Sequence, residues 1–197
     1  MPGWQELMPV TEALRLLMEA VPGGRLEHEE IELRAVAGRV LAADVQAPDD
    51  IPQFTRSAMD GYAVRAADVS AAAGARPIPL RVVGEVLMGE PATMPVGPGE
   101  AAAIPTGGML PPGADAVVIV EVTEREGETV FVRESVAPGE NVSRRGDDLR
   151  AHDVVLRRGH RLRPQDVGVL AGIGLTRIQV YRRPAVALLS TGNEVVA

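Results

Sequence analysis

Residues 116–122 read Ala-Val-Val-Ile-Val-Glu-Val, a run that is apolar at six of its seven positions. Alternating apolar and polar residues would indicate a strand with one solvated face, whereas a continuous apolar run indicates a strand covered on both faces. Gly and Pro clusters separate this run from other runs of strand-forming residues. Those runs are 62–64, 78–87, 101–104 and 129–134. The centre of the chain is therefore predicted to be a β-rich unit.

The segments on either side of this β-rich unit have different patterns. Residues 10–21 space Leu and Met as an amphipathic helix does, with Thr11 as the expected N-cap. Residue spacing and the Pro and Gly signals predict further elements. They predict a strand with a short crossover over 30–45 and a helix over 165–173 opened by Pro164. They also predict strands at 178–181 and 185–189.

Residues 48–52, Pro-Asp-Asp-Ile-Pro, interrupt regular structure ahead of the β-rich unit. Each Pro removes a backbone donor and restricts the residue before it, so a helix or a central strand is unfavourable here. After Asn141 the pattern changes again. These two points are the predicted limits of the β-rich unit.

The composition of the 197 residues excludes several classes of chemistry. There is no Cys, which excludes disulfides, zinc–thiolate sites and a Cys nucleophile. There is no Lys, which excludes a Lys Schiff base and a Walker loop. A net charge of −7 argues against a nucleic-acid partner. Since no stretch reaches the roughly 20 apolar residues of a membrane helix and no basic leader is present, we expect a soluble, cytoplasmic protein with no membrane partner.

Residues 185–194 change abruptly from apolar to polar. An apolar run over 185–189 followed by Ser-Thr-Gly-Asn-Glu is typical of the first strand and loop of a parallel α/β domain. Ligands of such sheets bind at the carboxyl ends of the strands, which makes Glu194 a candidate site residue; Asn193 or Glu194 could instead cap a following helix. A parallel strand needs neighbours and covering helices, so we expect this chain to be the front half of a longer protein.

Residues 57–63, Ser-Ala-Met-Asp-Gly-Tyr-Ala, form a small polar loop that leads into a strand. Asp60 could ligate a hard cation such as Mg²⁺ or hold a ligand hydroxyl, and Gly61 would let the backbone approach a ligand closely. The alternative is an Asp-Gly turn in which Asp60 caps its own backbone. Residue type alone favours the turn.

Residues 105–115, Pro-Thr-Gly-Gly-Met-Leu-Pro-Pro-Gly-Ala-Asp, form a Gly- and Pro-rich loop between two strands. Its backbone N–H groups could line an anion site, with the Thr106 hydroxyl as an additional donor. The loop lacks the Gly-Lys-Ser/Thr ending of a Walker loop. A structural loop in which Asp115 caps the next strand or turn is the simpler interpretation.

A third polar segment, 144–148, reads Arg-Arg-Gly-Asp-Asp. Its adjacent carboxylates could share a divalent metal, and its Arg pair could bind phosphate. The alternative is a solvated turn whose ion pairs contribute little to stability. The three histidines, His28, His152 and His160, have no metal-site spacing and are expected to be surface or hydrogen-bonded residues.

Taken in order, these segments resemble the signatures of one family, the molybdopterin molybdenumtransferases (MoeA and the gephyrin E domain). The segment from Asp50 to Arg65 is similar to the first signature, and the segment from Thr106 to Glu121 is similar to the second. The segment 144–149 is similar to the third. Matches to the start of the family's α/β domain are Leu170-Ala171, Gly174, Arg183-Pro184 and Ser190-Thr191-Gly192. The resemblance covers about residue 30 to the last residue.

The resemblance implies a dimer of elongated chains with four domains each. The fold class implied for this chain is α+β: a β-rich insert domain, a small α/β linking domain, and the first strand of a truncated molybdopterin-binding α/β domain. The implied bounds are 1–24 for an N-terminal helix that associates with the later α/β domain, 25–46 and 142–183 for the linking domain, 47–141 for the insert, and 184–197 for the truncated domain.

The activity implied by the resemblance is the insertion of molybdate into the dithiolene of adenylylated molybdopterin, with Mg²⁺-dependent release of AMP. Asp60 and Asp148 are assigned to Mg²⁺ or to substrate positioning, Thr106 to hydrogen bonding, and Glu194 to the α/β half of the site. These four are the expected catalytic residues. The expected cofactor-binding residues are Ser57, Gly61 and Gly107.

Three positions depart from the family pattern: Pro105 and Met109 beside the Thr106-Gly107 pair, and Asn193 where Asp is usual. Because most of the α/β domain is missing and family sites combine residues of both subunits, we expect the 197-residue chain to be inactive alone. The implied partners are a second copy of the chain, the two substrates and the molybdopterin adenylyltransferase. Two other interpretations stay open, a non-catalytic dimerisation module and a β-rich small-molecule binder outside this family.

Overall fold

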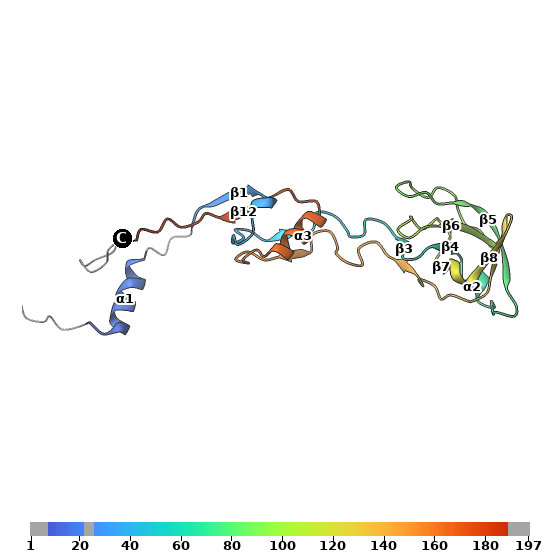
Figure 1. Cartoon of the computed structure of the whole chain (residues 1–197), viewed down its shortest axis with the longest axis horizontal. Coiled ribbons are helices and arrows are strands. Elements are labelled where there is room, and N and C mark those ends of the chain that lie inside the picture. The colour runs from blue at the N-terminus through green and yellow to red at the C-terminus, as the bar shows by residue number, and fades with distance from the viewer. Residues whose placement is uncertain (1–7, 22–25, 189–197) are drawn as a thin grey trace, which may run out of the picture. The chain divides into compact units, whose positions relative to one another are not determined.

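The computed structural model describes residues 8–21 and 26–188. The chain is mostly β with few helices and divides into two compact units (Figure 1). We call residues 1–43 with 157–197 the framing unit, and residues 44–156 the inserted unit. The predicted limits of the β-rich insert were 47 and 141, so the inserted unit reaches further along the chain on its C-terminal side.

The inserted unit is built on one six-stranded sheet of order β7-β4-β6-β5-β9-β8. Neighbouring strands are antiparallel except for the parallel pair β5–β6. The strands are β4 (Gly61–Val64), β5 (Ile78–Glu85), β6 (Glu100–Ile104), β7 (Ala116–Ile119), β8 (Thr123–Glu126) and β9 (Thr129–Val132). The five β-type runs in the sequence thus correspond to five of these strands, and β8 is an additional one.

The central strands are covered on both faces, as the apolar run in β7 predicts. All four residues of β4 are buried, with Val64 packed in one core and Ala63 in the other. In β7, Ala116 to Ile119 continue the sheet, but the prediction of a strand up to residue 122 was wrong. Val120 is 49% exposed and begins the 3-10 helix η2 (Val120–Val122). Its N–H donates a hydrogen bond to the Asp60 carbonyl at 3.0 Å.

Short elements complete the inserted unit. They are β2 (Val45–Gln46), paired with β11 (Val154–Leu156), β3 (Arg56–Ser57), paired with β10 (Val142–Ser143), and the one-turn helix α2 (Ala66–Val69). The first and last segments of the unit run side by side, since the Ala47 N–H donates to the Asp153 carbonyl at 2.9 Å and the His152 N–H donates to Ala47 at 2.9 Å.

The framing unit pairs two segments that lie far apart in the sequence. Strand β1 (His28–Glu32) is antiparallel to β12 (Arg177–Tyr181), and η1 (Leu33–Ala35) packs near helix α3 (Pro164–Gly172). Strand β12 was predicted to begin one residue later, and α3 to end one residue later. The core of this unit comprises Leu33, Val36, Leu41, Leu162, Leu170, Ile178 and Val180.

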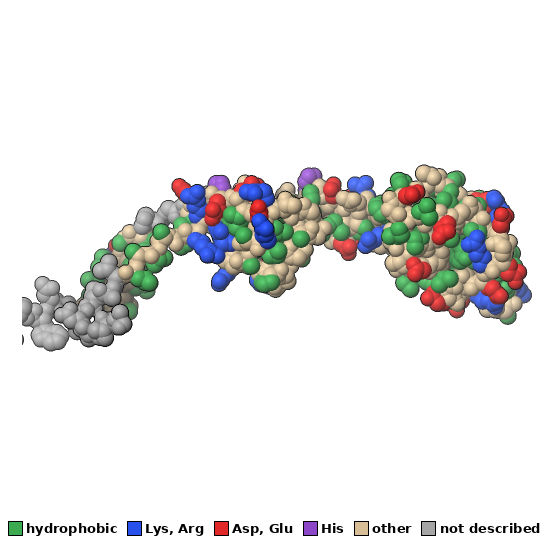
Figure 2. Space-filling model, turned by 45° about the horizontal axis from the view of Figure 1, so that its top comes forward, with side chains coloured by type: hydrophobic (Ala, Val, Ile, Leu, Met, Phe, Trp, Pro, Cys, Tyr) green, Lys and Arg blue, Asp and Glu red, His purple; other side chains and the backbone are tan. Residues whose placement is uncertain are grey.

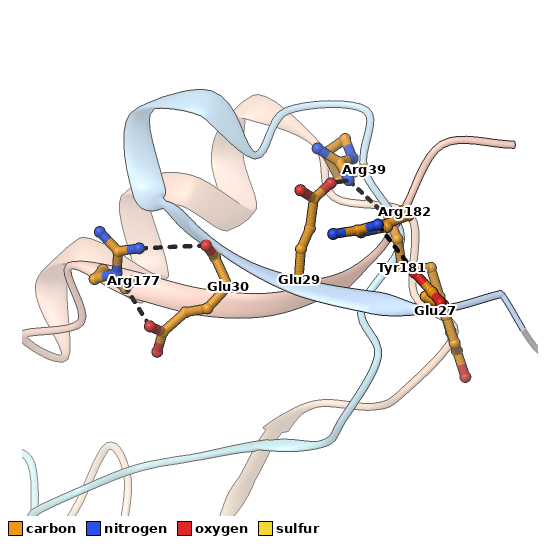
Figure 3. A network of polar contacts seen from close by, with 7 residues as sticks. All are labelled: Glu27, Glu29, Glu30, Arg39, Arg177, Tyr181 and Arg182. Atoms are coloured by element: carbon orange, nitrogen blue, oxygen red, sulfur yellow. Dashed lines mark hydrogen bonds and ion pairs between the residues drawn. The ribbon is translucent and has the colours of Figure 1, made fainter. Parts of the chain in front are cut away.

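The acidic residues of β1 are paired with Arg side chains on neighbouring segments (Figure 3). Arg39, whose side chain is 11% exposed, donates to Glu29 Oε1 at 2.5 Å and to the Tyr181 carbonyl at 2.8 Å. This hydrogen bond from Arg39 lowers the pKa of Glu29. Glu30 pairs with Arg177 at 3.2 Å in the same strand pair. The acids of this strand pair are therefore neutralised locally by Arg side chains.

Helix α3 begins with a buried carboxylate. Asp166 accepts hydrogen bonds from the Arg163 backbone N–H at 2.8 Å and from the Arg163 guanidinium, and its Oδ2 lies 2.7 Å from His160 Nε2. The Arg163 side chain, then His160, then the Arg163 N–H hold the pKa of Asp166 well below its usual range. The expectation of a hydrogen-bonded histidine is confirmed for His160.

Two expectations at the ends of the chain were wrong. Helix α1 (Val10–Ala20) begins after Pro9 rather than after Thr11, because the Glu12 and Ala13 N–H groups already donate to the Pro9 carbonyl. Residues 185–188 form no strand within the described part of the chain, where no neighbouring strand pairs with them, and Leu188 is 93% exposed. Position 189 of the predicted strand lies outside the described residues. Over residues 8–21 and 26–188, no helix has both the length and the apolar character needed to cross a bilayer.

Candidate functional site

Four strand ends of the inserted unit meet at one edge of the sheet. Gly61, at the start of β4, pairs with Ile104 at the end of β6 and with Ile119 at the end of β7. Glu85, at the end of β5, pairs with Ala103. These pairs join residues 18, 43 and 58 positions apart in the sequence (85 and 103, 61 and 104, 61 and 119), so distant segments converge on this edge.

Asp60 and Thr106 form a hydrogen-bonded pair at this edge. Asp60 Oδ1 accepts the Thr106 backbone N–H at 2.6 Å and the Thr106 hydroxyl at 2.8 Å. The backbone N–H, followed by the hydroxyl, lowers the pKa of Asp60, so its carboxylate is ionised at neutral pH. This arrangement contradicts the turn in which Asp60 caps its own backbone, because its partner is 46 residues away.

The hydrogen bond also changes what Thr106 can offer to a ligand. Its hydroxyl hydrogen is directed to Asp60, so the free side of the oxygen is an acceptor rather than the additional donor expected from the sequence. With the ionised carboxylate beside it, the pair presents oxygen acceptors and negative charge. Such a pair suits a cation or an N–H donor and disfavours a bare oxyanion.

Three predicted cofactor-binding residues, Ser57, Gly61 and Gly107, lie in the two segments that contain Asp60 and Thr106. The buried Ser57 hydroxyl donates to the Met59 carbonyl at 2.5 Å, and the Gly107 N–H donates to the Ser57 carbonyl at 2.8 Å. Gly107 has a φ of +84°, a conformation that other residues rarely adopt. Gly61 leaves no room for a side chain, because a Cβ there would lie 1.9 Å from the Val118 carbonyl oxygen. Contact of these residues with a ligand stays a prediction.

A cavity of about 260 Å³ opens beside the pair, and we call it the Asp60 cavity. Two carboxylates, Asp60 and Glu85, face it together with apolar groups, and no Arg lines it. A larger hollow of about 600 Å³ lies in the framing unit around Arg34, which is already paired with Glu32. We take the Asp60 cavity as the candidate site because the Asp60 carboxylate that lines it accepts two hydrogen bonds from Thr106, which lower its pKa. Its lining is Asp60, Gly61, Tyr62, Glu85, Ala103, Ile104, Pro105 and Val120.

Asp148 does not line the Asp60 cavity. Its N–H donates to the Ile51 carbonyl at 2.9 Å, and its side chain is exposed. The antiparallel pairing places Val142 opposite Ser57, so residues after Ser57 run away from the 144–148 turn. Asp148 therefore lies outside the lining of the Asp60 cavity, and its role at the site stays a prediction.

The 144–148 turn is organised by Asp50, which the sequence analysis placed in the Pro-rich interruption 48–52 and at the start of the first family-like segment. Asp50 Oδ2 accepts Arg145 Nε at 2.5 Å, and its Oδ1 accepts the Ala151 N–H at 2.8 Å. The Ala151 N–H, then the Arg145 side chain, lowers the pKa of Asp50. Asp147 Oδ2 accepts the Arg144 N–H at 2.6 Å. The polar groups of this turn thus pair largely with one another, as the solvated-turn interpretation expects.

Part of the expected magnesium chemistry fits the Asp60 cavity. Both hydrogen bonds to Asp60 use Oδ1, which leaves Oδ2 for a cation. Mg²⁺ characteristically takes one or two carboxylates and fills its other positions with water and substrate phosphates. Among residues 8–21 and 26–188, no group of three or more His, Cys, Asp or Glu side chains could hold a metal ion. Any cation here would therefore have one or two carboxylate ligands from the described residues and take its remaining ligands from water or from a bound molecule.

Two further acids bear on the site, Glu194, which was predicted, and Glu85, which was not. Glu194 and the Ser-Thr-Gly-Asn segment before it lie outside the described residues. Glu85 was not singled out by the sequence, where it is an acid within the predicted strand run 78–87. Its strand pairing with Ala103 brings it to the cavity, and only the register of β5 against β6 could have indicated this.

Comparison with known proteins assigns these features to one family. Residues 8–174 match the family model described as the MoeA N-terminal region (domain I and II). The curated molybdopterin molybdenumtransferase of Synechococcus elongatus is 37% identical over 191 residues, which is 96% of this chain and 47% of that protein. The one from Staphylococcus epidermidis is 35% identical over 187 residues, 95% of this chain and 44% of that protein.

A solved structure supports the same likeness. The crystal structure of the molybdopterin biosynthesis moeA protein from Pyrococcus horikoshii OT3 superposes with a TM-score of 0.82 at 42% identity. The match covers 91% of this chain and 47% of that one. The chain spans about half the length of the curated relatives it matches.

Proposed function

Because the chain belongs to the MoeA N-terminal region family, we propose that it forms the domain I and II part of a molybdopterin molybdenumtransferase. Its role would then be in the biosynthesis of the molybdenum cofactor. The observation that carries the proposal is the Asp60–Thr106 pair, which joins two of the family-like sequence segments across 46 residues at the mouth of a cavity.

The proposed reaction inserts molybdate into the dithiolene of adenylylated molybdopterin and releases AMP. Mg²⁺ held at Asp60 Oδ2 would offset the charge of the phosphoanhydride. Asp60 remains ionised because Thr106 lowers its pKa, so it is suited to holding a cation or an N–H donor and is a weak proton acceptor. Thr106 fixes the orientation of that carboxylate through two hydrogen bonds.

The remaining predicted residues would complete the site from elsewhere. Asp148, with its exposed side chain, would contribute to substrate positioning from outside the Asp60 cavity. Glu194 would belong to the α/β half of the site. We further propose a cytoplasmic homodimer that receives its substrate from the molybdopterin adenylyltransferase.

Helix α1 would pack on the α/β domain in the complete protein. Its apolar side chains are exposed, with Val10 84% and Met18 66% accessible. Its polar face is occupied by Arg15, which pairs with Glu12 at 2.6 Å and with Glu19 at 2.7 Å. A helix of this kind requires an apolar partner surface.

A chimera tests the proposed function. Residues 1–183 of this chain would replace the matching half of the Pyrococcus horikoshii protein, and conversion of adenylylated molybdopterin with molybdate would be measured by AMP release. We expect conversion by the chimera and none by the 197-residue chain alone. A folded chimera without activity would contradict the proposed function, and conversion by the chain alone would contradict the predicted need for the α/β half.

The alternative is a dimerisation or interaction module without chemistry. That module would gain nothing from the added half, so the chimera would be inactive while the chain still formed dimers. Removing residues 184–197 adds a second measurement, because unchanged solubility and dimerisation would show that the tail is not integral to the fold.

A further inference from the structure

A second cavity, which lies in the framing unit, is lined by positive rather than negative side chains. It has a volume of about 230 Å³ and lies where the chain enters β1 and leaves β12. Three Arg residues line it, Arg39, Arg182 and Arg183, and no acidic residue does. We call it the Arg39 cavity.

The Arg39 guanidinium is held in place and still has donors to offer. Its Nη2 donates to Glu29 Oε1 at 2.5 Å and to the Tyr181 carbonyl at 2.8 Å (Figure 3). Neither Nε nor Nη1 has an acceptor among the described residues, although the side chain is only 11% exposed. No buried side-chain nitrogen of the described residues lacks a hydrogen-bond partner, so these two atoms are accessible from outside. Three N–H donors are therefore left for a ligand.

The charges around this cavity leave an excess of positive charge. Arg39 is neutralised by Glu29, and Arg182 is paired at 2.9 Å with Glu27. Within the described residues, Arg183 has no hydrogen bond or ion pair. Its charge acts at the same place, because the pKa of Glu29 is lowered first by the Arg39 hydrogen bond and also by the charges of all three Arg residues. Three cations against two anions leave a net charge of +1.

The rest of the lining is largely apolar. It includes Leu26, Val40, Tyr181 and Pro184. Sites for small ligands typically combine such a lining with a few polar groups that fix the orientation of the ligand. Sites for drug-sized ligands have roughly 300–1,000 Å³, so a cavity of about 230 Å³ suits a ligand of one ring.

The net charge distinguishes between classes of anion. A carboxylate carries one negative charge, and a guanidinium donates to it through parallel hydrogen bonds. A phosphate group carries about −1.5 to −2 at neutral pH, which exceeds the excess charge at this cavity. A bare inorganic anion would also leave the apolar part of the lining without a contact.

We propose that the Arg39 cavity binds a small carboxylate with an apolar body of about one ring. Arg39 donates to the carboxylate, Arg183 supplies the balancing charge, and the apolar lining contacts the body of the ligand. This site goes beyond the proposed function and does not depend on it.

Titration of the 197-residue chain with benzoate tests the site, because benzoate is one ring that bears one carboxylate. Side-chain and backbone N–H signals are followed by two-dimensional ¹⁵N NMR at pH 7. We expect saturable shifts of the Arg39 Nε–H signal and of the Val40 and Tyr181 backbone signals. Benzamide, which has the same shape without the charge, should bind roughly tenfold more weakly. Acetate, which lacks the ring, should bind roughly tenfold more weakly as well.

Two variants separate the geometry of the guanidinium from its charge. Arg39→Lys keeps the charge but loses the planar set of donors, so benzoate should bind roughly tenfold more weakly. Arg183→Gln removes the unpaired charge from an exposed position and should weaken benzoate about fivefold, with benzamide unaffected. The matched control is Arg34→Gln, which removes the same charge from an exposed residue of the same unit outside the cavity. It should leave benzoate binding unchanged.

Three results would overturn the site. They are the absence of saturation at millimolar benzoate, equal binding of benzamide and benzoate, and equal losses of affinity in Arg183→Gln and Arg34→Gln. Equal losses would mean that benzoate responds to the net charge of the unit rather than to this cavity. If Arg39→Lys does not fold, the comparison of the two exposed variants decides the question. The chimera could convert substrate whichever way these measurements fall.

Discussion

The framing unit and the Asp60 cavity of the inserted unit use acidic side chains in different ways. The framing unit has 9 Asp and Glu against 11 Arg, and the inserted unit has 18 against 9, a net of +2 compared with −9. In the framing unit, Glu29, Glu30 and Asp166 pair with Arg. At the Asp60 cavity neither carboxylate has an Arg partner among the described residues. Figure 2 shows acidic side chains scattered over the visible face of the inserted unit.

The partner of each acid indicates whether that acid is available for chemistry. A carboxylate that closes an ion pair across a two-stranded sheet is fully used by the fold. A carboxylate held by a hydroxyl and a backbone N–H keeps its charge and one oxygen for a ligand. The identity of the partner, more than the residue type, therefore separates structural acids from candidate functional ones.

The largest effect is expected from Gly61→Ala, a substitution at a residue that lines the Asp60 cavity. The new Cβ would meet the Val118 carbonyl oxygen at 1.9 Å, so β4 and β7 must move apart. We expect the free energy of unfolding to fall by about 3 kcal/mol, the upper range for overpacked positions. Urea unfolding followed by circular dichroism measures it. Gly74→Ala is the control, since its Cβ would meet nothing within 4 Å.

The second effect concerns activity. Asp60→Asn in the chimera keeps a side-chain oxygen for Thr106 but removes the charge, so we expect kcat/KM to fall roughly 100-fold, the size of one lost electrostatic contact in a site. AMP release measures it. Glu128→Gln removes an acid from an exposed turn of the same unit and should leave kcat/KM unchanged. Equal losses in the two variants would mean that net charge, rather than the pair, matters.

The third effect is a pH dependence in the framing unit. Because the pKa of Asp166 is lowered by folding, the carboxylate contributes stability above its unfolded pKa of about 3.9, and this is lost as pH falls through the folded value. Asp166→Asn should therefore unfold more easily at pH 6 and depend less on pH below 4. Urea midpoints between pH 2 and 6 measure this. Parallel curves for the two proteins would refute the assignment.

The smallest effect is expected from Glu30→Gln. The Glu30 and Arg177 side chains are 59% and 51% exposed, and ion pairs in such positions contribute little because water and salt screen them. We expect the free energy of unfolding to change by no more than about 0.5 kcal/mol in 0.15 M salt. A larger loss would show that the β1–β12 charges are more important to this unit than their exposure indicates.

The sequence predicted the parts of the fold whose cause is local. A continuous apolar run predicts a strand buried on both faces, and β4, β6 and β7 are such strands. Strand β8 escaped prediction because Thr-Glu-Arg-Glu is a polar edge strand whose pairing with β9 leaves it exposed. The strand expected at 185–189 is absent over 185–188 because a strand needs pairing partners, which no local pattern supplies.

The site was predicted to a different extent. Asp60 and Thr106 were identified from two family-like segments, but their hydrogen bond depends on the register of β4 against β6. Glu85 was missed for the same reason, since an acid that ends an apolar strand has no distinctive local pattern. Asp148 was identified by motif order, and its backbone N–H donates to the Ile51 carbonyl outside the lining of the Asp60 cavity, so its role at the site stays a prediction. Residue types can be read from the sequence, whereas which of them lie side by side depends on the pairing and register of the strands in the sheet.

The pairing of β2 with β11 has a consequence for how this architecture can be altered. The first and last segments of the inserted unit are hydrogen-bonded neighbours, so both its termini lie together. In the framing unit, Leu41 is likewise hydrogen-bonded to His160 and Gly159. A short turn could therefore reconnect the framing unit after excision of residues 44–156, because closing a short loop costs little entropy. The inserted unit is in this sense a transplantable module, which could be exchanged between relatives or circularly permuted without cutting a strand of its six-stranded sheet.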